Sequence, residues 1–508
     1  MVGRDGTAVR AGRREWLGLA VLALPTLLVS LDTFVMLLAL PRLATSLHAN
    51  SAQQLWIMDI YGFMVAGFMI TMGTLGDRIG RRKLLLAGAA VFGVASVLAA
   101  SSTSPGMLIA TRALLGIAGA ALTPSTLSLI TNMFADPRQK ASAIGVWAGC
   151  FTVGAIIGPI AGGVLLDHFW WGSVFLLGVP AMVLLLVLGP VLLPEYRNPA
   201  AGRLDLPSVV LSLASILPII HGLKELARDG WHVTPVVFLV AGLAVGVVFV
   251  RRQNTLADPL LDLRLFADRS FSTTLGSMLT YSMLSGGTMV FVAQYFQLVD
   301  GLSPLRAGLA LVPGMLAAIV SFQLAPILAR RIRPAYLFGA GLAVSVAGLL
   351  VMTQSGTSGA AVLVAGFGVT CFGTGPLVTL GTNLVVGSVP VERAGSAAAL
   401  AQTGNEFGYA LGIAVLGSVM TAVYRTRVAE ALPGGAPAAA RDSIAGASRL
   451  GGAVLTAAHH AFVDGLHAVA ALSALILAGV AVLLATTLRR VPAIGAPEPE
   501  ASPADIAV

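Results

Sequence analysis

The sequence predicts an all-α membrane protein whose chain crosses the bilayer fourteen times. Of its 508 residues, 56% are hydrophobic and only 11% are charged, whereas about a quarter of the residues in soluble domains are charged. Apolar runs of roughly 20 residues recur along the whole chain, and each is long enough to cross a hydrocarbon layer about 30 Å thick. Because these runs are continuous and do not alternate with a period of two, they exclude a transmembrane barrel.

The fourteen apolar runs divide the chain into spans joined mostly by short loops. An even number of spans places both ends of the chain on the same side of the membrane. The spans are expected at about 17–41, 54–75, 84–102, 107–129, 142–164, 173–193, 206–223, 235–251, 272–298, 305–328, 335–353, 361–385, 396–423 and 466–488.

The distribution of Lys and Arg indicates on which side of the membrane the two chain ends lie. Of the 31 basic residues, 22 lie in the loops on the side of the two chain ends, Arg112 lies inside a span, and eight, Lys224 among them, are expected at the opposite ends of the spans. Loops rich in Lys and Arg stay in the cytoplasm. We therefore expect a multi-pass protein of the cytoplasmic membrane with both termini inside. The net charge of +8 then serves orientation and implies no nucleic-acid partner.

Five ionisable residues are expected in or at the ends of spans, where an apolar side chain would be ordinary. A charge at the centre of a bilayer costs about 2.5–3.5 kcal/mol on insertion scales, so such residues usually face an aqueous cavity and have a function. A buried ion pair that only holds helices together is the alternative interpretation. The five are Asp32, Asp59, Asp77, Arg112 and Glu406.

Asp32 is the first of these acids and stands well inside the first apolar run. Its one-turn neighbours on a helix, Leu28, Val29, Val35 and Met36, are all apolar. We therefore expect Asp32 to have no local cation partner and to be open to a ligand. A carboxylate in a cavity of low dielectric constant can alternate between a protonated and a cation-binding state near neutral pH.

Four motifs on the first five spans resemble those of the major facilitator superfamily. They are GTLGDRIGRRKLL from Gly73 to Leu85, LIATRALLGIAGAA from Leu108 to Ala121, GAIIGPIAGG from Gly154 to Gly163, and LDTFVMLLALP from Leu31 to Pro41. The last is similar to a motif of the fourteen-span drug:proton antiporter branch. The resemblance implies two six-helix bundles with two extra central helices, and it matches Arg112 with an arginine tied to proton translocation.

A finer resemblance links the chain to the quaternary-ammonium and dye efflux pumps of that branch. It rests on QLWIMDIYGF (residues 54–63), FWWGSVFLLGVP (169–180) and GLSPLRAGLALVP (301–313). It implies that Asp32, Asp59 and Glu406 take part in cation recognition or proton coupling. Relatives that handle divalent cations carry a further acid in the tenth span, and residues 313–326 contain none, which favours monovalent cations.

The motif glycines suit a transporter whose halves move against each other. A strip of small residues lets helices approach closely, and a proline removes one backbone hydrogen bond and bends its helix. The second-half counterpart of the first motif, ARRIRPAYL, keeps its arginines and lacks the Gly and Asp. The expected conformational residues are Gly73, Asp77, Arg78, Gly80, Arg81, Gly154, Gly158, Pro159, Gly162 and Gly163.

A cavity for flat lipophilic cations needs aromatic and Met walls beside its acid. Residues on the faces expected to point inward are candidates for this lining, although each could instead face lipid or the membrane interface. The candidates are Phe34, Met36, Trp56, Tyr61, Trp147, Phe151, Tyr295 and Phe296.

The expected domain organisation follows from the spans and the resemblance. Two segments outside the spans have an unusual composition. The loop 424–465 is rich in Ala and Gly and is expected to be mobile. The proline-containing cytoplasmic tail is expected to be disordered. The units are an N-terminal arm 1–16, a six-helix bundle 17–193, two extra helices 206–251, a second six-helix bundle 272–488 that includes the outer loop 424–465, and the tail 489–508.

These features predict a proton-coupled antiporter that exports lipophilic, mainly monovalent organic cations by alternating access. Export of one specific antibiotic or metabolite, neutral or anionic, is the alternative; an intramembrane enzyme and a sensor or scaffold are other classes. No Gly-Lys-Ser/Thr phosphate-binding loop occurs, so we expect no ATP drive. The sequence also predicts no cofactor and no metal site, and the protein is expected to be monomeric.

Overall fold

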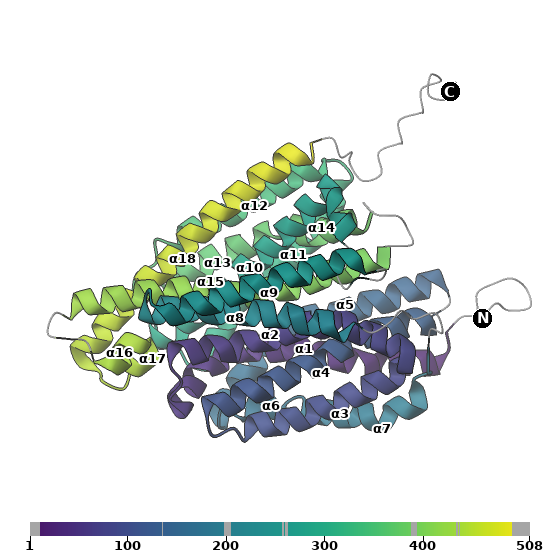
Figure 1. Cartoon of the computed structure of the whole chain (residues 1–508), viewed down its shortest axis with the longest axis horizontal. Coiled ribbons are helices and arrows are strands. Elements are labelled where there is room, and N and C mark those ends of the chain that lie inside the picture. Colours follow the sequence, from purple (N-terminus) through teal and green to yellow (C-terminus); the bar gives the residue numbers. More distant parts are fainter. Residues whose placement is uncertain are drawn as a thin grey trace, which may run out of the picture.

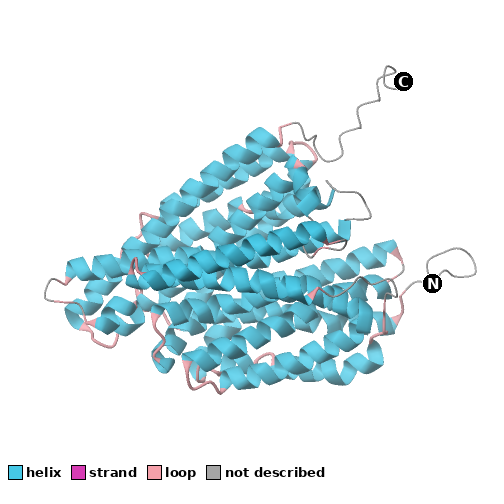
Figure 2. Cartoon of the chain, viewed as in Figure 1, coloured by secondary structure: helices cyan, strands magenta, loops and turns pink. Residues whose placement is uncertain are grey.

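Helices are the only regular secondary structure in the described part of the chain. The computed structural model describes residues 11–134, 136–197, 205–256, 259, 263–387, 394–432, 435 and 437–489, and no strand occurs among them. Within these residues, fourteen helical segments are long and apolar enough to cross a membrane. Figure 2 shows helices joined by short loops. The predicted all-α, fourteen-span fold is confirmed.

The first half of the chain contributes six crossings, the last of which is built from two consecutive helices. The helices are α1 (Arg13–Leu47), α2 (Ser51–Ile79), α3 (Arg81–Ala100), α4 (Pro105–Met133), α5 (Pro137–His168), α6 (Ser173–Leu176) and α7 (Val179–Leu192). Two further crossings follow, α8 (Leu206–Asp229) and α9 (Val233–Thr255).

The second half begins with a 3₁₀ turn, η1 (Leu263–Ala267), and also contributes six crossings. One crossing combines two helices, α13 and α14. The helices are α10 (Arg269–Leu298), α11 (Pro304–Ala329), α12 (Pro334–Met352), α13 (Ala360–Gly373), α14 (Gly375–Gly387), α15 (Ala394–Ala431), α16 (Ala438–Asp442), α17 (Ile444–Ala447) and α18 (Gly452–Thr487).

The two halves lie side by side, and α8 and α9 run along the seam between them (Figure 1). Helix α8 packs against α2 of the first half and α15 of the second, while α9 packs mainly on α8. At the end of the molecule that carries Arg78, Arg251 and Arg252, the arginine-rich end, Asp205 joins α8 to α9 by a 2.9 Å ion pair with Arg252. Partial burial alone would raise the pKa of the Asp205 carboxyl, but hydrogen bonds from Ser208 and Arg252 hold that pKa below its usual value.

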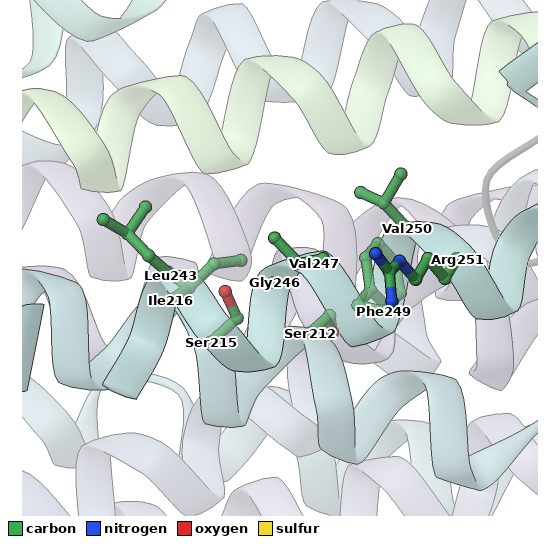
Figure 3. A pocket seen from close by; sticks show the side chains of 9 residues that line it. All are labelled: Ser212, Ser215, Ile216, Leu243, Gly246, Val247, Phe249, Val250 and Arg251. Carbon is green, nitrogen blue, oxygen red and sulfur yellow. The ribbon is translucent and has the colours of Figure 1, made fainter. Parts of the chain in front are cut away.

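Helix α9 has an exposed apolar face that includes Val237, Val240 and Leu243, as a helix that faces lipid would have. A shallow groove of about 560 Å³ follows α8 and α9 and is lined mostly by apolar side chains, with Ser212 and Ser215 beside them (Figure 3). The groove contains no acidic residue.

Local sequence signals explain where several helices begin at the opposite end of the molecule. At the start of α2, the Asn50 side chain accepts a hydrogen bond from the backbone N–H of Gln53, and the Gln53 side-chain oxygen accepts one from the backbone N–H of Asn50. Ser104 and Ser303 cap α4 and α11 in the same way, and each is followed by a proline that needs no hydrogen bond in the first turn. These caps fix the short loops that the hydropathy pattern predicts.

The predicted outer loop 424–465 is largely helical. Helix α15 continues to Ala431, α18 begins at Gly452, and the short helices α16 and α17 lie between them. Tyr424 donates a hydrogen bond of 2.9 Å to the carbonyl oxygen of Ala440, and Arg449 contacts the ring of His48 and the backbone of Thr45 at the end of α1. The segment that was expected to be mobile from its Ala- and Gly-rich composition thus contains helices and contacts α1 through Arg449.

The glycine motif of α5 forms two tight interfaces. Gly154, Gly158 and Gly162 face α1, where an added Cβ would lie 2.7–2.9 Å from side-chain atoms of that helix. Gly163 faces α11 of the other half, and a Cβ there would lie 2.4 Å from the Cα of Leu305. A Cβ added at Gly308 of α11 would likewise lie 2.4 Å from the carbonyl oxygen of Pro159. The two halves are therefore in backbone contact at the end opposite the arginine-rich loops.

Gly163→Ala tests this contact, because the new methyl group meets backbone and cannot be accommodated by a side-chain rotation. We expect it to lower the free energy of unfolding by about 1–3 kcal/mol, measured as a lower thermal midpoint of the purified protein. Gly149→Ala on the same helix is the matched control, since nothing lies within 4 Å of its added Cβ. Equal midpoints for the two variants would contradict the close packing of α5 on α11.

Candidate functional site

A small cavity of about 20 Å³ lies where α1, α2, α4 and α15 meet, between the two halves. The first half contributes a cation and an aromatic ring to its lining, and α15 of the second half contributes an acid. The lining residues are Thr33, Met58, Tyr61, Gly62, Arg112, Glu406, Tyr409, Ala410 and Ile413. Of the sequence-predicted residues, the cavity thus brings together Tyr61, Arg112 and Glu406.

Asp32 is paired with Arg112 across the interface of α1 and α4. Oxygen Oδ2 of Asp32 lies 2.5 Å from Nη1 of Arg112, and the two side chains are 13% and 2% exposed. Arg112 also donates from Nε to the carbonyl oxygen of Ile57 at 3.2 Å, and its guanidinium lies 4.8 Å from the centre of the Tyr61 ring. The side chain of Arg112 is therefore held by α1 and α2 together.

The prediction that Asp32 is open to a ligand because it has no local cation partner is wrong. Its helical neighbours are apolar, as predicted, but α4 brings Arg112 to the carboxylate from another part of the chain. The spacing of residues along one helix reports only contacts within that helix. Burying an unpaired carboxylate would cost free energy, and the ion pair with Arg112 offsets this cost.

Glu406 is the acid that lines the cavity, and it has no cationic partner in the described part of the chain. Gln402, one turn earlier on α15, donates a hydrogen bond of 3.3 Å to Oε1 of Glu406. No Lys, Arg or His of the described residues lies within ion-pair distance of this carboxylate. The hydroxyl groups of Tyr61 and Tyr409 are buried, and neither has a hydrogen-bond partner in the described part of the chain. The cavity therefore offers one carboxylate and two hydroxyl groups to a ligand.

Asp59 lies on the other side of α2 from the cavity and is paired with Lys224 of α8. The distance from Oδ2 to Nζ is 2.7 Å, and both side chains are at most 1% exposed. The ring of Trp56 covers the ammonium group at 3.8 Å. Asp59 and Tyr61 are two residues apart, which turns their side chains to nearly opposite faces of a helix. Asp59 is therefore not among the residues that line the cavity.

Lys224 lies near the end of its span, as expected, and the sequence did not reveal that it is buried against Asp59. The apolar run ends at residue 223, but α8 continues to Asp229, so Lys224 is still helical and faces α2. An available signal was Asp59 itself, because an acid in a span requires a partner. Tyr409, three residues after Glu406 on α15, was also missed.

Most of the aromatic and Met candidates lie elsewhere in the fold. Tyr61 lines the cavity, and Trp56 covers Lys224. Phe34 packs against Gly158 of α5, and Met36 is buried in the main core. Trp147 donates to Thr126 and contacts Phe151 edge to face. Tyr295 and Phe296 are fully buried within the second half, where Tyr295 contacts the backbone of Gly356 and Gly359.

The loop between α2 and α3 is fixed to the end of α7. Arg81 forms a 2.7 Å ion pair with Asp77, and Gly80 adopts φ = +114°, which favours glycine. The backbone of Arg82 donates to Glu195 at 3.1 Å, and its guanidinium donates to the carbonyl oxygens of Pro190 and Leu193. Arg78 is exposed, and nothing lies within 4 Å of a Cβ added at Gly73. The first motif thus holds three helices together at the arginine-rich end.

Comparisons with known proteins agree with this architecture. The chain is 40% identical over 504 residues to the multidrug efflux pump LfrA of Mycolicibacterium smegmatis, covering 96% of this chain and 99% of that protein. It is 34% identical over 471 residues to the methyl viologen resistance protein SmvA of Salmonella typhimurium, covering 89% and 93%.

A solved structure shares the fold. It is a bacterial homologue of the human lysosomal transporter Spinster, with a TM-score of 0.70 and 17% identity over 94% of this chain and 98% of that one. The sequence profile of the Major Facilitator Superfamily matches residues 22–413. The chain is therefore a multi-span membrane transporter and belongs to the Major Facilitator Superfamily.

Proposed function

We propose that this protein exports lipophilic, mainly monovalent organic cations, such as quaternary ammonium compounds, dyes and drugs, in exchange for protons. The observation that carries the proposal is Glu406, a carboxylate in the cavity between the two halves with no cationic partner among the described residues. Relatives named as a multidrug efflux pump and a methyl viologen resistance protein support drug export.

The arginine-rich end faces the cytoplasm in this proposal, with both termini inside the cytoplasmic membrane. The halves touch at the opposite end, through Gly163 and Leu305. Alternating access requires this contact to open while the arginine-rich end closes. The cavity is small in the present conformation, so a dye-sized substrate requires the halves to separate around Glu406.

The Asp32–Arg112 pair supplies a way to couple protons to the cation. Arg112 keeps its proton at any working pH, and it lines the same cavity as Glu406. When Asp32 takes up a proton, the positive charge of Arg112 is no longer balanced beside the substrate cation. The cation then binds less tightly and leaves. Loss of the proton toward the cytoplasm restores the pair and the affinity.

The proton gradient can drive this exchange without ATP or a cofactor. An entering proton gains about 2.3 kcal/mol per 100 mV of membrane potential, but one-for-one export of a monovalent cation uses the same amount, so the net drive of such an exchange is the pH difference. Each unit of pH difference adds about 1.4 kcal/mol. A neutral or anionic antibiotic or metabolite as substrate would not need the carboxylate of Glu406, which makes the charge of that residue the decisive test.

Glu406→Gln removes the carboxylate and keeps the shape of the side chain. We expect it to reduce uptake of ethidium, a monovalent dye, at least about tenfold in proteoliposomes with an imposed pH gradient, as loss of a close charge pair in a medium of low dielectric constant would. Glu430→Gln is the matched control, because Glu430 lies on the same helix and is 58% exposed. Wild-type uptake by Glu406→Gln would favour the neutral or anionic substrate.

Asp32→Asn imitates the protonated state permanently and leaves Arg112 unbalanced. We expect gradient-driven ethidium uptake to be abolished while expression is unchanged. The dissociation constant for ethidium should rise about tenfold or more. Asp167→Asn, at an exposed ion pair with Arg42, is the control. Full transport by Asp32→Asn would remove this carboxylate from the coupling.

A further inference from the structure

The buried charges around the cavity sum to a single negative charge in the described part of the chain. Asp32 is balanced by Arg112 at 2.5 Å and Asp59 by Lys224 at 2.7 Å. Glu406 has Gln402 as its hydrogen-bonding partner and no cation. Lys224 is the member of this set that comes from α8, one of the two helices between the six-helix halves.

Lys224 lies close enough to the cavity for its charge to act there. Its partner Asp59 follows Met58 and precedes Gly62 within one turn of α2, and both of those residues line the cavity. On α8, Ile220 packs with Phe63, Ala410 and Ala414, and Phe407, next to Glu406, joins this cluster. The ammonium group is therefore separated from the cavity by about the width of one helix, roughly 10 Å. Buried charges at such distances are screened little.

The surroundings of the Asp59–Lys224 pair resemble a binding site for an organic cation. The Trp56 ring covers the ammonium at 3.8 Å, and the His221 ring packs against Trp56. Oxygen Oδ1 of Asp59 is buried without a hydrogen-bond partner in the described residues. A carboxylate beside an indole face is what a quaternary ammonium or pyridinium ion needs. The ammonium group of Lys224 occupies this position and neutralises the negative charge of Asp59.

We propose that Lys224 determines the charge class of the substrate, by neutralising Asp59 so that Glu406 alone presents a negative charge and monovalent cations are preferred. This inference rests on the proposed export of organic cations. A lysine that only fastens α8 to α2 would stabilise the fold and leave the choice between monovalent and divalent cations unchanged. The two roles therefore differ in the ratio of transport rates.

Four versions of the protein test the charge count with ethidium as the monovalent cation and methyl viologen as the divalent one. In proteoliposomes, Lys224→Met adds one negative charge and should raise the ratio of methyl viologen to ethidium uptake at least about tenfold over wild type. Asp59→Asn leaves Lys224 unbalanced and should lower ethidium uptake by a similar factor. The double variant restores the wild-type net charge. It should therefore restore both the rate of ethidium uptake and the ratio of methyl viologen to ethidium uptake.

The controls separate charge from folding. Lys224→Arg keeps the positive charge and should keep the wild-type ratio. Thermal midpoints show which variants fold; if Lys224→Met does not, the comparison of Asp59→Asn with the double variant decides, because the latter has no unpaired buried charge.

An unchanged ratio in folded Lys224→Met, or no recovery of ethidium uptake in the double variant, overturns the role of Lys224. If the wild type transports neither cation, the proposed function fails and this inference fails with it. Wild-type ethidium transport with an unchanged ratio in Lys224→Met would refute only the charge-class role.

Discussion

A charge buried in hydrocarbon must be balanced, and this constraint organises the centre of the protein. Two of its acids meet it inside the chain, since Asp32 pairs with Arg112 and Asp59 pairs with Lys224. Each pair joins two different helices, so the same contacts that remove the cost of a lone charge also fix how those helices pack. Glu406 departs from the pattern, because among the described residues it has a hydrogen bond from Gln402 and no cationic partner; this is why we propose that a substrate cation binds beside it.

Helix α2 connects the two ion pairs. Its carbonyl at Ile57 and its Tyr61 ring hold Arg112 on one side, while Asp59 holds Lys224 on the other. The same helix contacts α15, which carries Glu406, through Gly62 and Ala410. A movement of α15 relative to α2 therefore changes the surroundings of all three acids together. This arrangement connects α8, one of the two additional helices, to the candidate cavity through α2.

The sequence contains enough information for the fold because lipid imposes simple rules. Runs of apolar residues and the positions of arginines define the spans, and Ser104 followed by Pro105 marks where a helix starts. The identity of Arg112 and Glu406 as intramembrane charges was predictable for the same reason. Their partners were not, because pairing depends on which helices are neighbours and how each is rotated. Asp32 was expected to be open to a ligand because its own helix offers no cation, and Lys224 was placed at the end of a span, where nothing in the sequence indicates its burial against Asp59. Aromatic residues such as Tyr295 and Phe296 carry no signal that separates a cavity wall from the interior of one half.

Exchange of a proton for the organic cation is the central claim, and movement of protons during dye entry tests it most directly. Proteoliposomes with a pH-sensitive dye in the lumen and no initial pH gradient receive ethidium on the outside only. The account predicts that ethidium entry drives protons out, so that the luminal pH rises, and that vesicles containing Asp32→Asn show no rise. Entry of ethidium through the wild-type protein with a constant or falling luminal pH would contradict it.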